Sequence, residues 1–165
     1  MIIDSHLHLW RLSRGDYDWL TPDATALYRD FLPSDLLPEF AAAGVAGGVA
    51  VQAAPTSAET LFLLDLAEAE PALFGVVGWT DLGDPRAPEV IAGLARRPKL
   101  KGLRPMLQDL PDDDYILAPA LTRGLRAMQE TGLAFDALVR PRHLRRLVQL
   151  GQSHPALTII IDHAG

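Results

Sequence analysis

Two histidines lie two positions apart near the start of the chain, in the segment MIIDSHLHLW. His6 and His8 follow a short apolar run of the kind found in β-strands, and residues two apart in a strand project from the same side. Two imidazoles on one side can bind one metal ion or the oxygen atoms of one substrate. A third histidine, His163, also follows an apolar run, in the segment IIIDHAG. The spacing therefore predicts a catalytic or metal-binding centre built at the ends of strands.

Six apolar runs rich in β-branched residues are expected to form the strands that carry these histidines. Several of them, including VAVQ and FGVVGW, lack alternation, which is typical of strands buried on both faces of a parallel sheet. Helix signals lie between them, such as the capping-box pair Thr56 and Glu59 and the terminal glycines Gly44 and Gly132. We expect strands at residues 1–7, 45–52, 73–82, 100–107, 133–139 and 157–162, and helices at residues 34–44, 56–71, 84–98, 117–132 and 140–155.

The alternation of strands and helices predicts an α/β fold with a parallel sheet and right-handed connections. Six strand–helix units are two short of the (β/α)8 TIM barrel, which usually needs about 250 residues. We therefore expect residues 1–165 to form a single domain, the N-terminal portion of a TIM barrel with about six β/α units, incomplete at its C-terminus. The long irregular segment after the first strand, residues 10–33, is expected to cover the end of the barrel.

Polar residues at the expected strand ends are the candidate site residues, because catalytic groups of parallel α/β folds gather there. Besides the three histidines, the strand ends deliver Gln52, Trp79, Arg104 and Asp136. Asp4 and Asp162 are expected to orient neighbouring histidines through the second ring nitrogen. His143 and His154 lie in a polar helix and at its exit, and we expect both at the surface.

The composition narrows the classes of function. Acidic residues outnumber basic ones, 21 to 15, for a net charge of −6, which argues against nucleic acid as a partner. The chain has no cysteine, so thiolate metal sites and thiol nucleophiles are excluded. The chain does not open with a basic leader and an apolar stretch, and no apolar run approaches the roughly 20 residues of a membrane span. We therefore expect a cytoplasmic protein that acts on a small molecule and not on a membrane, with a homodimer left open.

Five segments together resemble the amidohydrolase superfamily, and more narrowly its lactonase-like branch of TIM-barrel hydrolases related to L-fuconolactonase and L-rhamnonolactonase. They are DSHLHLW, YDWL, GVVGWTDL, LKGLRPMLQ and IIIDHAG, in this order along the whole chain. The H-x-H motif is common to the superfamily, whereas YDWL, GWTDL and KGLRP are more specific to the lactonase-like branch. The resemblance implies opening of the ring of a sugar lactone or a related lactone by attack of water at a strand-end site, in carbohydrate metabolism.

The resemblance also implies roles for individual residues. The catalytic and metal-binding residues would be His6, His8 and His163. The substrate-binding residues would be Arg104, Gln52, Trp79 and Asp136, with Arg104 on the carbonyl or carboxylate oxygens. One divalent metal ion, zinc or manganese, would be held at the histidines, although members of the lactonase-like branch also work without a metal. The family places a general-base aspartate at the end of the eighth strand, beyond these 165 residues, so we expect the chain alone to be inactive.

Two other interpretations stay open. Metal-dependent non-oxidative decarboxylases of the same superfamily also carry an H-x-H motif and a histidine at the sixth strand, and tightly bound zinc or manganese would favour them. The chain could instead be an inactive fragment or a binding module. Cooperative unfolding of a monomer of this length would then favour a self-sufficient domain.

Overall fold

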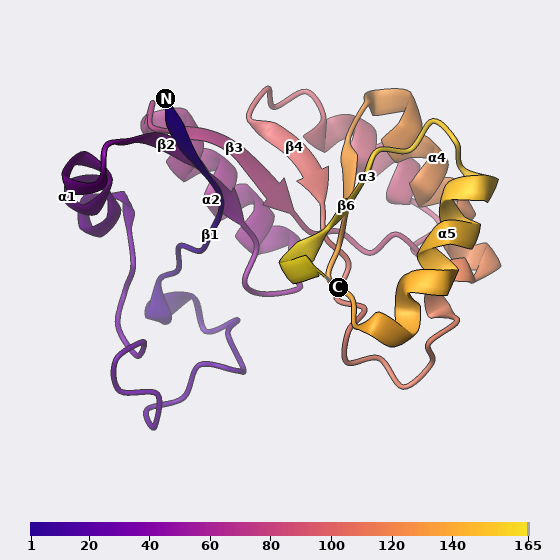
Figure 1. The fold of residues 1–165 in the computed structure, drawn as a ribbon, viewed down its shortest axis with the longest axis horizontal. Helices are drawn as coiled ribbons and strands as arrows, with labels where there is room; N and C mark the ends of the chain where they lie inside the picture. The colour runs from indigo at the N-terminus through magenta and orange to yellow at the C-terminus, as the bar shows by residue number, and fades with distance from the viewer. Residues whose placement is uncertain (165) are drawn as a thin grey trace. The chain divides into compact units, whose positions relative to one another are not determined.

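The computed structural model describes residues 1–164 and divides into two compact units. The first unit spans Met1–Trp79, and the second begins at Thr80. Each unit holds three parallel strands that neighbour one another in chain order (Figure 1). Helices separate successive strands, which is the repeat from which a (β/α)8 barrel is built. The expectation of one domain over the whole chain stays a prediction.

The first unit is a three-stranded parallel sheet with two helices. Its strands are β1 (Ile2–Leu7), β2 (Val45–Val51) and β3 (Leu73–Gly78), and its helices are α1 (Pro33–Ala43) and α2 (Ser57–Ala69). Strand β2 lies in the middle and pairs with both β1 and β3. The register places Leu7 of β1 opposite Ala50 of β2, so the residues after both strands come out at the same edge.

Burial explains why β2 and β3 lack alternation. Ala50, Val51 and Val76 have no exposed surface, although neighbouring positions in a strand point to opposite faces. Helix α2 packs against β3 and turns the fully buried Leu63 and Leu64 inward. Burial of a side chain of this size contributes about 1.5–3 kcal/mol to folding.

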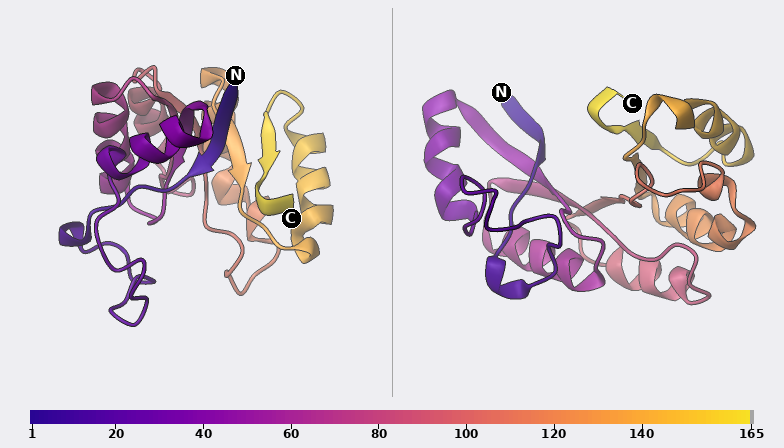
Figure 2. Two further views of the ribbon diagram at one scale, coloured as in Figure 1. Left: turned by 60° about the vertical axis from the view of Figure 1, so that its left-hand side comes forward. Right: turned by 90° about the horizontal axis from the view of Figure 1, so that it is seen from below.

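The second unit repeats the arrangement. Its strands are β4 (Leu100–Leu103), β5 (Ala134–Ala137) and β6 (Ile159–Ile161), and its helices are α3 (Ala87–Leu94), α4 (Thr122–Thr131) and α5 (Leu144–Ser153). Strand β5 pairs with β4 and β6, and helices α3 and α4 pack together. Helix α5 lies beside β6 (Figure 2). Phe135, Met128 and Leu150 are fully buried in this unit.

All six expected strands are present, but β3 and β4 end earlier than the apolar runs do. After Gly78, the backbone N–H of Trp79 donates to the hydroxyl of Thr60 on α2, at 2.7 Å, and so leaves the strand pairing. Strand β4 ends at Leu103, because Pro105 has no backbone N–H to donate to a neighbouring strand.

The sequence signals mark the C-termini of α1 and α4 and the N-terminus of α2, where Thr56 is the N-cap. Gly44 and Gly132 end α1 and α4 with φ values of 68° and 70°, a left-handed conformation that glycine adopts without strain. Helix α3 begins at Ala87, later than expected, because the carboxylate of Asp84 accepts the backbone N–H of Arg86 at 2.7 Å and forms a turn first. Within residues 1–164, no helix combines the length and apolar character that crossing a membrane requires.

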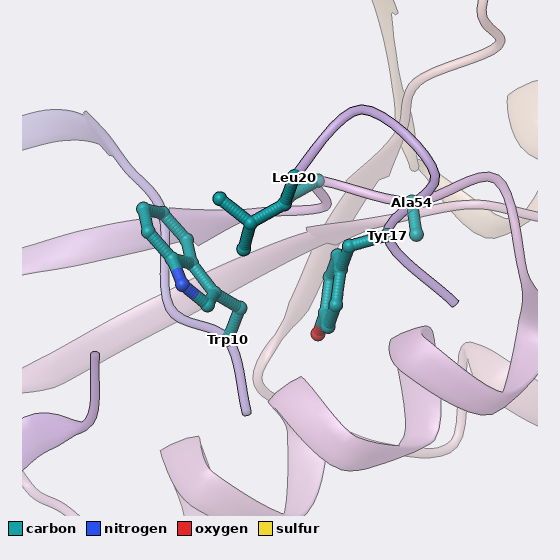
Figure 3. Packing of buried hydrophobic residues seen from close by; sticks show 5 residues of the cluster. Trp10, Tyr17, Leu20 and Ala54 are labelled. Carbon is teal, nitrogen blue, oxygen red and sulfur yellow. The ribbon is translucent and has the colours of Figure 1, made fainter. Parts of the chain in front are cut away.

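Residues 8–32, here called the first loop, form an ordered segment with a small core of its own. Trp10 and Phe31 pair their backbones near its two ends, with N–O distances of 2.9 and 3.0 Å. The indole N–H of Trp19 donates to the carbonyl of Ala53, just after β2, at 2.8 Å. The buried cluster comprises Trp10, Tyr17, Leu20, Ala53 and Ala54 (Figure 3). The first loop is therefore docked on the residues that follow β2.

Candidate active site

The two histidines of the H-x-H motif lie at the carboxyl end of β1 with their rings in contact. The Nε2 atoms of His6 and His8 are 3.2 Å apart, and the rings meet edge to face with their centroids 4.9 Å apart. Both side chains are half-buried, with a water-accessible edge. The structure thus brings together the two imidazoles that the strand spacing places on one side.

A backbone carbonyl fixes the orientation of the His8 ring. The Nδ1 atom of His8 lies 2.9 Å from the carbonyl oxygen of Val51, on the neighbouring strand β2. A carbonyl can only accept a hydrogen bond, so this Nδ1 carries the proton. In the neutral ring, Nε2 is then an unprotonated acceptor that can bind a metal ion or take a proton from a bound water.

The other candidates of the first unit are held mainly through backbone contacts. The carboxylate of Asp4 accepts the backbone N–H of His6 at 3.0 Å, a contact to the main chain where we expected one to a ring nitrogen. Gln52 follows β2 directly and its side chain is fully buried. Trp79 follows β3 and is half-buried, and the hydroxyl of Thr60 donates to its carbonyl at 2.7 Å. Hydrogen bonds to Asp4 and Trp79 and the burial of Gln52 therefore fix the positions of these candidates.

In the second unit, Arg104 after β4 forms a buried ion pair with Asp162 after β6. The Nη1 of Arg104 lies 3.3 Å from Oδ2 of Asp162, and each side chain is only 4% exposed. Two opposite charges buried together stabilise each other, and the loss of one of them is costly to folding. The sequence separation of these residues is 58 positions, and no local pattern predicted the pair.

Asp136 on β5 is a third buried polar group in this cluster. Burial raises the pKa of Asp136, the neighbouring carboxylate of Asp162 raises it further, and Arg104 lowers it. Its Oδ1 atom has no hydrogen-bond partner among the residues that the structure describes. The second unit therefore places an aspartate that holds a proton more readily than usual beside a carboxylate–guanidinium pair.

His163 follows β6 with an unusual backbone conformation. Its φ of 52° and ψ of 21° lie in the left-handed region, which residues other than glycine rarely adopt. Strain of this kind persists where the surrounding structure holds a side chain in place, and it is enriched at functional sites. As a residue, His163 is exposed. Asp162, which we expected to orient this ring, makes its ion pair with Arg104.

Two histidines that we expected at the surface lie differently. The prediction for His143 was wrong, since its side chain is buried and only 2% of the residue is exposed. The Nδ1 of His143 accepts the backbone N–H of Arg140 at 3.0 Å, and its Nε2 lies 3.1 Å from a carboxylate oxygen of Asp113. His154 is half-buried, and its Nδ1 lies 3.0 Å from the amide nitrogen of Gln129.

The sequence reasoning missed the role of Glu59. One half of the expected capping box is present, because the hydroxyl of Thr56 accepts the backbone N–H of Glu59 at 3.0 Å. The carboxylate of Glu59, however, accepts the backbone N–H groups of Ala53 and Ala54 after β2. A signal was available, since Glu59 lies four positions before Leu63, on the buried face of α2. Burial raises the pKa of Glu59 to about 6, although the two backbone N–H groups lower it.

Comparison with known proteins connects these features to a family. A family model described as amidohydrolase matches residues 3–165. The chain belongs to the amidohydrolase family. It is 49% identical over 162 residues to an L-fucono-1,5-lactonase of Burkholderia ambifaria, covering 98% of this chain and 56% of that protein. It is 38% identical over 164 residues to an L-fucono-1,5-lactonase of Burkholderia multivorans, covering 99% of this chain and 55% of that protein. This amidohydrolase chain thus spans about half the length of the curated relatives it matches.

A solved structure supports the fold of this amidohydrolase. A crystal structure of an amidohydrolase from Burkholderia multivorans with bound zinc is similar over 100% of this chain and 58% of that one, with a TM-score of 0.91 and 37% sequence identity. The similarity confirms the predicted fold class, an α/β fold that forms the N-terminal portion of a (β/α)8 TIM barrel with six β/α units. The predicted membership of the amidohydrolases is likewise confirmed.

Proposed function

We propose that this chain belongs to an enzyme that hydrolyses a sugar lactone, with L-fucono-1,5-lactone as the first candidate substrate. The observation that carries the proposal is the pair of His6 and His8 Nε2 atoms at the end of β1, with the tautomer of His8 set by Val51. The two relatives named L-fucono-1,5-lactonase, 49% and 38% identical, support the substrate class. A role in carbohydrate metabolism and a cytoplasmic location go with this proposal.

A divalent metal ion, zinc or manganese, fits the donor atoms at the H-x-H motif. Imidazole nitrogen is a common ligand of zinc, and the His8 tautomer leaves its Nε2 free of a proton, 3.2 Å from the corresponding atom of His6. We propose His6, His8 and His163 as the ligands, because the carboxyl ends of the strands of a (β/α)8 barrel form one catalytic face. Zinc in the similar structure from Burkholderia multivorans supports this assignment. When bound, such an ion polarises a carbonyl and lowers the pKa of a bound water.

The polar residues of this chain can supply the remaining requirements of lactone hydrolysis. A guanidinium carries five N–H donors, so the pairing of Arg104 with Asp162 is compatible with a hydrogen bond from Arg104 to the lactone carbonyl oxygen. That oxygen becomes negatively charged when water adds, and a charged donor stabilises it most in that state. We propose that Gln52 and Asp136 bind sugar hydroxyl groups and that Trp79 offers its indole to the sugar ring.

Two alternatives have less support. A metal-dependent decarboxylase of the same superfamily would use the same histidines, but the relatives that are most similar among those described carry the lactonase name. Hydrolysis without a metal, by the same residues, is the second alternative. Removal of bound metal from the complete gene product distinguishes them, because a decarboxylase loses its activity and a metal-independent lactonase keeps it. A homodimer stays a prediction.

The test uses the complete gene product and a panel of sugar lactones that includes L-fucono-1,5-lactone. Arg104→Ala and His163→Asn should each lower kcat/KM by about 10²–10³, the usual effect of removing one donor to an oxyanion or one group of the catalytic centre. His154→Asn is the matched control, because it makes the same change at the end of α5, and it should keep near-normal turnover. Turnover near that of the wild type in both site variants would overturn the proposal.

A further inference from the structure

The residues from Val51 at the end of β2 to the start of α2 contact several parts of the first unit. Their backbone begins at Val51, whose carbonyl holds the ring of His8, and continues through Gln52. The next carbonyl, that of Ala53, accepts the indole N–H of Trp19 in the first loop. A displacement of these few residues would therefore move the His8 ring, the Gln52 side chain and the first loop together.

The carboxylate of Glu59 on α2 accepts hydrogen bonds from the backbone of this segment. Its Oε2 lies 3.0 Å from the backbone nitrogen of Ala53 and 2.6 Å from that of Ala54, and its Oε1 lies 3.1 Å from the nitrogen of Ala53. Hydrogen bonds from backbone N–H groups to a carboxylate are among the stronger ones in proteins. Glu59 thus satisfies two consecutive donors that belong to no strand or helix.

The usual partner of a glutamate at this helix position is occupied by another group. In a capping box, Glu59 would accept the backbone N–H of Thr56, but that N–H donates to the carbonyl of Ala54 at 2.9 Å. The hydroxyl of Thr56 accepts the N–H of Glu59 and donates to the carboxylate of Asp16 in the first loop, at 2.8 Å. The start of α2 is therefore capped without the Glu59 carboxylate, which leaves the carboxylate to bind the segment after β2.

A helix cap alone does not require a buried charge at this place. Glu59 has no exposed surface, and burial of a carboxylate opposes folding unless hydrogen bonds compensate it. The hydroxyl of Tyr17 is a polar neighbour of this carboxyl and lowers its pKa. An apolar residue at position 59 would leave the N–H groups of Ala53 and Ala54 buried without an acceptor.

We propose that Glu59 is a positioning residue for catalysis, which holds the segment after β2 so that Val51 orients His8 and Ala53 fixes the first loop through Trp19. The effect on turnover rests on the proposed lactonase function, whereas the docking of the first loop does not. Glu59 acts through these neighbours and touches no reacting atom.

The test compares Glu59→Gln with Glu59→Ala in the complete gene product. The amide oxygen of glutamine, in the place of Oε2, can accept both N–H groups, so Glu59→Gln should retain turnover within about threefold, since the shorter hydrogen bond to each nitrogen is conserved. Glu59→Ala should lower kcat/KM about ten- to hundredfold, because small displacements of catalytic groups have effects of that size. Glu68→Ala, at an exposed position on the same helix, is the matched control and should behave as the wild type.

Limited trypsin digestion measures loop docking independently of activity. Arg11 and Arg29 lie in the first loop and are exposed, and cleavage after them should be at least about tenfold faster in Glu59→Ala than in Glu59→Gln if docking is lost. If Glu59→Ala does not fold, Glu59→Asp, one methylene shorter, takes its place with the same expectation. Equal cleavage rates in all variants would overturn the inference, as would equal activity of Glu59→Gln and Glu59→Ala. An inactive wild type with the expected cleavage pattern would overturn the proposed function and leave the positioning of the loop supported.

Discussion

The replacement of Glu59 by glutamine should remove a specific pH dependence of folding stability. Burial raises the pKa of Glu59 in the folded state to about 6, against an ordinary value of 4.5 in the unfolded chain. Between these two values the folded state binds more protons than the unfolded state. The free energy of unfolding contributed by this group therefore falls as the pH rises from about 4.5 to about 6, and is constant above and below that window.

The magnitude follows from the two pKa values. They differ by about 1.5, and a difference of one corresponds to about 1.4 kcal/mol, so the ionised Glu59 lowers the free energy of unfolding at pH 7 by about 2 kcal/mol relative to pH 4. The direction is opposite to that of Asp35 and Asp113, whose pKa values are lowered by the backbone N–H of Leu32 and by Arg142, respectively. These groups stabilise the fold as the pH rises, so the Glu59 contribution must be isolated by a difference between variants.

Urea denaturation of the wild type and of Glu59→Gln, at a series of pH values from about 4 to about 7.5, makes this measurement. The difference between the two free energies of unfolding should change by about 2 kcal/mol across the window, in favour of glutamine at high pH. The contributions of all other carboxyl groups cancel in the difference. A difference that stays constant with pH would refute the reasoning, because it would mean that Glu59 has the same pKa in both states.

Two further predictions concern the second unit. Asp162→Asn should lower the free energy of unfolding by about 3–5 kcal/mol in urea denaturation, because it removes the charge opposite the buried guanidinium of Arg104. The double variant with Arg104→Met should recover part of the loss, and no recovery would contradict this account. Gly132→Ala should lower the free energy of unfolding by about 1–2 kcal/mol, because φ is 70° at that position. Gly93→Ala inside α3 should raise the free energy of unfolding by about 0.5–1 kcal/mol, because the added methyl group has open space around it. A change of the same sign in both variants would count against the argument.

The parts of the fold that the sequence predicts well depend on local patterns. The strands β1 to β6 were recognisable because each is an apolar run, and β2 and β3 are buried along most of their length. Strand β6 differs, since Ile160 and Ile161 are 46% and 47% exposed. Gly44 and Gly132 marked helix ends because few other residues adopt a left-handed φ without strain. The contact of His6 with His8 follows from the period of a strand, which repeats every two residues.

The parts that were missed depend on partners distant in the sequence. The ion pair of Arg104 and Asp162 joins two strand ends, and neither residue has a neighbour along the chain that would predict the other. His143 was expected at the surface because its helix is basic, yet packing buries its ring beside Asp113. Local motifs predict which hydrogen bonds a side chain can make, and only the tertiary structure decides between them.

The orientation of His8 shows how such a distant partner completes a local motif. The H-x-H spacing places two imidazoles together, but it leaves open which nitrogen of each ring carries a proton. The parallel register brings Val51 beside His8, and its carbonyl selects the Nδ1–H tautomer. A neutral ring held in this way carries its proton on Nδ1 and presents an unprotonated Nε2. The chemistry expected of the motif therefore depends on the register of β2 as much as on the two histidines. A substitution that displaces the residues after β2 should for this reason lower turnover, although it lies away from the reacting atoms.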